Sequence, residues 1–88
     1  MIDSAQIRAA RALLNMNQAD LARFASVHVA TIRRIESATD VRGVAETLWK
    51  IQKSLEAAGI EFISDEGGKG PGVRFMEGSV QQSRRNQP

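Results

Sequence analysis

The sequence contains no cysteine, and this absence excludes two ways of stabilising a small fold. Without thiols the chain can form neither a disulfide framework nor a zinc–thiolate site. Its 88 residues are enough for one core only, and a core of that size buries little apolar surface. We therefore expect a single domain that gains support by pairing with a second copy, and neither a metal nor a cofactor.

Long apolar runs are absent as well. No stretch has the roughly 20 consecutive apolar residues that a membrane-spanning helix needs. Residues 1–4 also lack the basic start and apolar run of a secretion signal. These absences predict a cytoplasmic protein with no membrane partner.

The distribution of charge is more informative than the net charge of +2. Six arginines face three acidic residues between positions 4 and 42, whereas four basic residues face six acidic ones between positions 43 and 77. The basic half uses arginine only, and the planar guanidinium group suits phosphates and guanine edges. The pattern fits a polyanionic partner near the amino terminus and, equally well, a merely solvated basic surface.

Three short amphipathic helices are predicted in the amino-terminal half. Ser4 can cap the first helix, and Asn17 can cap the second, which covers residues 18–25. The third, over about residues 29–37, has isoleucines on one face and two adjacent arginines on the other. That arginine-bearing face is the part of the fold on which a function would depend.

A fourth helix and a β-hairpin are predicted in the remainder. Apolar residues recur at helical spacing over residues 44–58, and Gly59 stands at the preferred stop position. The period then changes to two, over residues 60–62 and again over residues 73–75, as in paired strands. Residues 78–88 lack an apolar pattern and are predicted to be disordered.

The second and third helices together fit a helix-turn-helix over residues 18–37. This motif crosses two short helices steeply through a tight turn, so its interior positions are constrained. Counting from Gln18, the fourth, eighth, tenth, fifteenth and eighteenth positions should be apolar and the fifth should be small. The residues at these positions are Leu21, Ala22, Ala25, Val27, Ile32 and Ile35. A purely structural bundle would share only some of them.

The segments Gln18-Ala-Asp-Leu-Ala and Ala30-Thr-Ile-Arg-Arg-Ile-Glu36 resemble the Xre class of helix-turn-helix regulators, relatives of Cro and the lambda repressor. The resemblance implies a mainly α, lambda-repressor-like DNA-binding domain of four or five helices over residues 4–58. A carboxy-terminal β-hairpin over residues 59–76 would follow and could serve in dimerisation. The implied partner is a double-stranded DNA operator.

The resemblance also implies roles for individual residues. In a helix that enters the major groove, the first residues and those one turn later reach base edges. The expected base-contacting residues are therefore Val29, Ala30, Arg33 and Arg34. Arg34 is the preferred base reader, while Arg33 could instead contact phosphate or remain solvated. The phosphate-contacting positions correspond to Gln18, His28 and Thr31.

Three positions depart from the family pattern. Ser26 stands where the turn usually has glycine, so a side chain must tolerate a positive φ at a cost of roughly 1 kcal/mol. His28 replaces the usual serine or threonine cap, and Val29 replaces a polar base reader. Readout through Val29 would be apolar, against a thymine methyl group.

Two further sets of residues are predicted to act in packing, one within the chain and one between two copies of it. Arg11 and Glu36 occupy positions that in this family form an ion pair between the first and third helices. Trp49 lies off the centre of its helix's apolar stripe, which suits a subunit interface or the edge of the core. The hairpin offers a second interface because its edge strand could pair with a second copy. The candidates are Trp49, Phe62, Val73 and Phe75.

A catalytic function fits the sequence less well than these interpretations. Asp20, Ser26 and His28 are the residue types of a hydrolase triad, but they lie within nine positions and lack a nucleophile elbow. Residues 67–72 are rich in glycine but lack the Walker spacing, so a hairpin turn explains them better. The sequence therefore predicts no enzyme and no catalytic residues.

The sequence as a whole predicts a dimeric repressor that binds a palindromic operator and controls its own promoter. One alternative with the same fold is an antitoxin-like or accessory module that engages a regulatory protein partner. Another is an interaction module that does not bind DNA.

Overall fold

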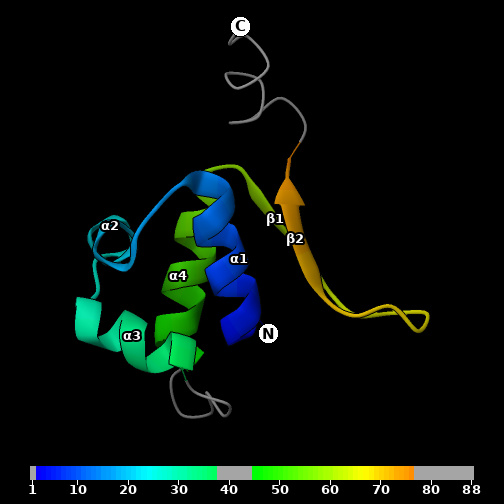
Figure 1. Ribbon diagram of the computed structural model, residues 1–88, viewed down its shortest axis with the longest axis horizontal. Coiled ribbons are helices and arrows are strands. Elements are labelled where there is room, and N and C mark those ends of the chain that lie inside the picture. The colour runs from blue at the N-terminus through cyan, green and yellow to red at the C-terminus, as the bar shows by residue number, and fades with distance from the viewer. Residues whose placement is uncertain (1, 38–44, 77–88) are drawn as a thin grey trace, which may run out of the picture.

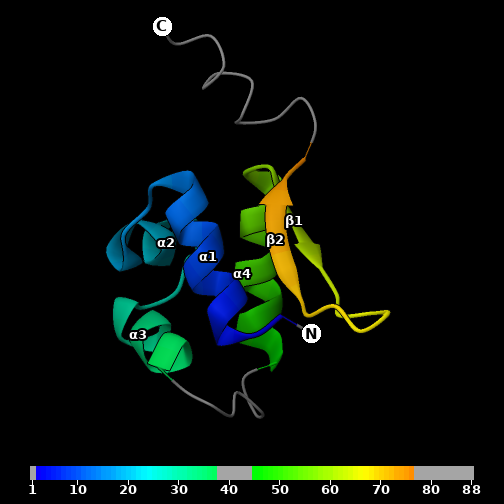
Figure 2. The same ribbon diagram turned by 45° about the vertical axis from the view of Figure 1, so that its right-hand side comes forward.

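The computed structural model describes residues 2–37 and 45–76. The elements follow the order α1 (Ser4–Leu14), α2 (Gln18–Ala25), α3 (Val29–Ser37), α4 (Ala45–Ala57), β1 (Ile60–Ile63) and β2 (Gly72–Phe75). Figures 1 and 2 show α2 and α3 on one side of α1 and α4, with the hairpin on the other. The predicted fold class, mainly α with a carboxy-terminal hairpin, is confirmed.

The first helix begins one residue earlier than predicted, because Asp3 and not Ser4 is its cap. The Asp3 carboxylate accepts a hydrogen bond from the Gln6 backbone amide at 2.8 Å, and the Gln6 side-chain oxygen accepts one from the Asp3 amide at 3.0 Å. This reciprocal arrangement needs an acceptor three residues after the cap. Counted from Ser4, that position holds Ile7, which has none. Ser4 is instead the first residue of the helix.

The second helix begins as predicted. The Asn17 side chain accepts a hydrogen bond from the Asp20 amide at 2.7 Å, and the Asp20 carboxylate accepts one from the Asn17 amide at 3.0 Å. Two of the four orphan amides at the start of a helix can be satisfied in this way. The amino end of α2 is therefore fixed by its own sequence.

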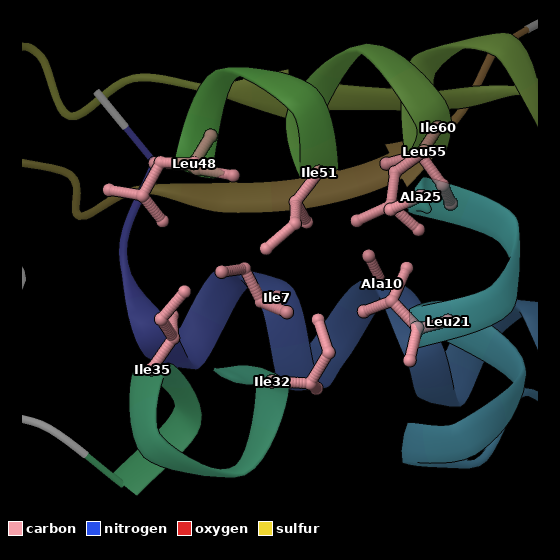
Figure 3. Close-up of a cluster of buried hydrophobic side chains, with 12 residues drawn as sticks. Ile7, Ala10, Leu21, Ala25, Ile32, Ile35, Leu48, Ile51, Leu55 and Ile60 are labelled. Atoms are coloured by element: carbon pink, nitrogen blue, oxygen red, sulfur yellow. The ribbon is translucent and has the colours of Figure 1, made fainter. Parts of the chain in front are cut away.

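The core is formed by side chains from all four helices and β1. Figure 3 shows them pointing toward one another between α1, α3 and α4. The largest fully buried ones are Ile7, Leu21, Ile32, Ile35, Leu48, Ile51, Leu55 and Ile60. Burying one aliphatic side chain stabilises the folded state by roughly 1.5–3 kcal/mol. The buried side chains of α2 and α3 therefore hold these two helices against α1 and α4.

The fourth helix is described from Ala45, since Val44 lies outside the described residues. It ends at Ala57, one residue before the predicted end at residue 58. Gly59, the predicted stop, follows in the turn with a φ of 103° that favours glycine. In the described part of the chain, no helix is both long and apolar enough to span a membrane. The tail predicted over residues 78–88 also falls outside the described residues.

The hairpin pairs β1 and β2 in antiparallel register, with Ile60 opposite Phe75 and Phe62 opposite Val73. Its tip closes at residues 66–69, where the central glycines have φ values of 60° and 80°. Positive φ at both central residues is typical of a type I′ turn, which matches the twist of the flanking strands. The glycine-rich segment is thus explained by the turn.

Candidate nucleic-acid interface

The turn between α2 and α3 is closed by backbone hydrogen bonds. Ser26 follows α2 in the left-handed conformation, with φ 59° and ψ 47°, which confirms the predicted positive φ. The Val27 amide then donates to the Ala22 carbonyl at 3.0 Å. Lys50 of α4 donates from Nζ to the Ser26 carbonyl at 3.5 Å. The turn is therefore held from both sides.

The interior of the two helices contains the residues that the motif requires. Five of the six positions are buried, with relative exposures of 0–4%, and they are Leu21, Ala22, Ala25, Ile32 and Ile35. Val27 is half-buried and packs against this core from the turn. The small side chain of Ala22 allows α3 to pass close to α2.

One face of α3 is exposed along its whole length. Ala30, Arg33, Arg34 and Ser37 are exposed, and their spacing of three, one and three places them on one side of the helix. Within the part of the chain that the structure describes, neither the Arg33 nor the Arg34 guanidinium group has a partner. Two adjacent cations therefore face solvent from a helix that is fixed by its buried face.

The other described arginines of the amino-terminal half bond within the protein. Arg8 donates from Nη1 to the Glu36 carbonyl at 2.5 Å. Arg23 contacts the Asp20 carboxylate at 2.5 Å across one turn of α2. Arg11 bonds to the Glu36 carboxylate at 2.7 Å. Among the described arginines of this half, those left to bind a partner are therefore Arg33 and Arg34 of α3.

Glu36 joins α1, α2 and α3. Its carboxylate is 3% exposed and accepts from Arg11 Nε at 2.7 Å and Arg11 Nη2 at 2.8 Å. Gln18 Nε2 donates to the same carboxylate at 3.1 Å. The hydrogen bond with Glu36 raises the pKa of Arg11 above its ordinary value, although burial acts the other way. Arg11 and Glu36 therefore form the interhelical ion pair expected from the sequence.

The other residues expected to contact DNA lie next to this face but differ in how exposed their side chains are. His28 is exposed at the start of α3, and Thr31 is half-buried. Val29 packs partly against the core, so only part of its side chain can reach a partner. Gln18 lies at the first position of α2, where its amide bonds to Glu36. The strongest polar groups of the face are thus the two arginines.

A family model described as helix-turn-helix matches residues 7–56. The chain belongs to the helix-turn-helix family. This is the Xre, lambda-repressor-like class of DNA-binding regulators that residues 18–36 resemble. Comparison with curated proteins gave no match.

The residue types of a hydrolase triad, Asp20, Ser26 and His28, are not joined into a triad by the bonds of the Asp20 carboxylate. The Asp20 carboxylate bonds to the amide of Asn17, which caps α2, and to Arg23 within α2, and not to His28. The family is one of DNA-binding regulators and is not typically enzymatic. The three residues are better explained by the cap, the turn and the start of α3.

The residues considered for dimerisation fall into two groups. Trp49 is 59% exposed on α4, and Lys53 Nζ lies 5.9 Å from the centre of its ring. Phe62, Val73 and Phe75 are only partly buried, but they pack against the core of their own chain. Trp49 is therefore the candidate with most surface left for a partner.

Sequence reasoning missed two side chains that join elements, Gln6 and Arg8, and one exposed aromatic side chain, Phe24. Gln6 is 7% exposed and donates from Nε2 to the Ile63 and Gly72 carbonyls, at 3.2 and 3.0 Å. It ties α1 to both strands of the hairpin. Arg8 bonds to α3, and Phe24 is 47% exposed on α2. The only available signal was the Asp3-to-Gln6 spacing of a capping box.

Proposed function

We propose that this helix-turn-helix protein is a dimeric repressor that binds an operator with approximate two-fold symmetry through α3. The observation that carries the proposal is the exposed face of α3, where the Arg33 and Arg34 guanidinium groups have no partner in the described chain. Guanidinium groups are the side chains best suited to guanine edges and phosphates. We therefore assign α3 as the recognition helix.

Binding in the major groove gives each residue of this face a role. Arg34 would bond bidentately to the O6 and N7 atoms of a guanine. Arg33 would contact a second base or a phosphate, and Ala30 and the exposed part of Val29 would contact thymine methyl groups. Gln18, His28 and Thr31 would bond to phosphates along the edges of the groove. Bound over a promoter, the protein would exclude RNA polymerase.

Dimerisation follows from the symmetry of such operators. Two copies would place their recognition helices in successive major grooves, about 34 Å apart. The exposed aromatic ring of Trp49 supports an interface on α4, because partly buried aromatic residues often anchor protein contacts. The same ring also favours the alternative, an accessory module that binds a regulatory protein partner.

The test compares Arg34→Ala with the wild type on a duplex that the wild type enriches from random DNA. Loss of a bidentate guanine contact should cost about 1–3 kcal/mol of discrimination against a scrambled duplex. Arg74→Ala is the matched control, because it removes one exposed arginine from the solvent face of the hairpin. Full discrimination by a folded Arg34→Ala protein would remove Arg34 from the interface. Failure of the wild type to enrich any duplex would overturn the proposed function.

A further inference from the structure

The carboxyl end of the recognition helix is bonded by side chains at four consecutive carbonyls, those of residues 33–36. Ser37 Oγ donates to the first two, at 3.0 and 3.2 Å. Ser4 Oγ donates to the third at 2.6 Å, and Arg8 Nη1 donates to the fourth at 2.5 Å. The last four carbonyls of a helix, here those of residues 34–37, have no backbone donor within the helix, so three of these bonds reach orphan carbonyls.

The two donors from α1 share one face of that helix. Ser4, Arg8 and Arg11 follow each other at spacings of four and three residues, so they line one side of α1. Ser4 and Arg8 bond to the backbone of α3, while Arg11 bonds to the Glu36 side chain. The positive charge of Arg8 also suits the negative end of a helix dipole. The two arginines of α1 therefore both lie close to negative charge on α3, Arg8 at its carboxyl end and Arg11 at the Glu36 carboxylate.

A bond to a backbone carbonyl constrains more than a bond to a side chain. The Glu36 carboxylate is separated from its backbone by rotatable bonds, whereas the carbonyls of residues 35 and 36 are part of the helix itself. The carbonyls of Arg33 and Arg34 lie immediately before them. The bonds from α1 fix the last turn of α3. They therefore set the direction in which the Arg33 and Arg34 side chains point into solvent.

We propose that Ser4 and Arg8 are positioning residues for DNA recognition, which fix the carboxyl end of α3 against α1 without contacting DNA. This inference rests on the proposed function for its DNA readout, but the contact itself can be tested without DNA. Because Asp3 caps α1, the Ser4 hydroxyl group is not needed to start that helix. Its removal therefore breaks the bond to the Ile35 carbonyl and leaves the cap of α1 in place.

The first experiment measures amide hydrogen exchange by NMR in Ser4→Ala and Arg8→Ala proteins. Loss of either donor should speed exchange in the last turn of α3 on the order of tenfold, with amides of α2 and α4 unchanged. Arg8→Lys keeps the charge and a donor group at the end of a long side chain, so it should restore most of the protection. Unchanged exchange in the last turn, or faster exchange throughout the protein, would overturn the proposal.

The second experiment measures affinity for the enriched and scrambled duplexes over a range of salt concentrations. Arg8→Ala should lose roughly tenfold in affinity for the enriched duplex relative to Arg74→Ala, which removes the same charge. The slope of log affinity against log salt should match that of Arg74→Ala. A slope smaller by about one would identify Arg8 as a direct phosphate contact and contradict the positioning role.

The two experiments separate the two proposals. If the wild type enriches no duplex, the proposed function fails, while the exchange measurement still decides whether Ser4 and Arg8 hold the end of α3. If the wild type binds DNA and the Arg8→Ala protein retains full discrimination, the positioning role fails and the proposed function stands.

Discussion

At the scale of single residues, Glu36 depends strongly on its partners, because its charge is buried. It is a buried carboxylate whose two oxygens are satisfied by Arg11 and Gln18. A buried charge left without its partner is strongly destabilising, because the remaining ion keeps the cost of its desolvation. The arrangement therefore makes the position of α3 depend on a residue of α1.

Arg11→Ala should lower the free energy of unfolding by about 3–5 kcal/mol, since it leaves the Glu36 carboxylate buried with Gln18 alone. Urea denaturation followed by circular dichroism measures this directly. Arg23→Ala breaks an exposed pair with Asp20 and should cost under about 1 kcal/mol. Equal losses in the two variants would show that the Arg11 pair is worth no more than a surface contact. DNA-binding defects of Arg11 variants must be interpreted after this measurement.

Single residues also show where sequence reasoning succeeded. The exposure of Arg33 and Arg34 and the burial of Ile32 and Ile35 follow from helical periodicity, which reports on neighbours three or four positions apart. The role of Arg8 could not be obtained in this way. Its bond joins residues 28 positions apart, and from its charge alone it resembled any other arginine of the basic half.

At the scale of elements, the turn of the helix-turn-helix stores a small strain at Ser26. Its φ of 59° places a side chain in the left-handed region, where glycine has no steric penalty. The residue is also the carboxyl cap of α2, the position at which glycine is most common.

Ser26→Gly should therefore raise the free energy of unfolding by roughly 0.5–1 kcal/mol, less the entropy that glycine adds to the unfolded chain. Thermal and urea unfolding would measure the gain. The same substitution at Ser54, inside α4, is the matched control and should destabilise by about 1 kcal/mol. A loss of stability in Ser26→Gly would mean that the hydroxyl group contributes more than the strain costs.

The elements differ in how far the sequence predicted them. The bounds of α2 and α3 follow from short-range signals, a cap at Asn17 and the apolar spacing, so they could be predicted closely. The start of α1 was misplaced because Ser4 is a good cap residue in isolation, whereas the box formed by Asp3 and Gln6 is better satisfied. The link from Gln6 to the hairpin spans 57 and 66 positions, and periodicity carries no information at that range.

At the scale of the whole molecule, the packing of the hairpin bears on which surface would form the proposed dimer interface. Its apolar face is used by its own core, which leaves Trp49 of α4 as the more exposed candidate. The hairpin could still pair through a strand edge. The two alternatives make different predictions for a substitution that leaves the core intact.

Trp49→Ala should weaken self-association by about tenfold or more if α4 forms the interface, since buried aromatic anchors often contribute at least 2 kcal/mol. Sedimentation velocity at several protein concentrations measures the change. Lys53→Ala is the control for the cation lying over the ring, and it should have a much smaller effect. Unchanged association of the Trp49→Ala protein would move the interface to the hairpin.

The proposed repressor function requires that α3 bind DNA with its exposed face. The most direct measurement is a titration of isotope-labelled protein with duplex DNA at low salt, followed by backbone and arginine Nε chemical shifts. We predict that the largest changes occur at Ala30, Arg33 and Arg34 and at the amino end of α2, and that added salt reverses them. The absence of changes, or changes confined to α4 and the hairpin, would contradict the account.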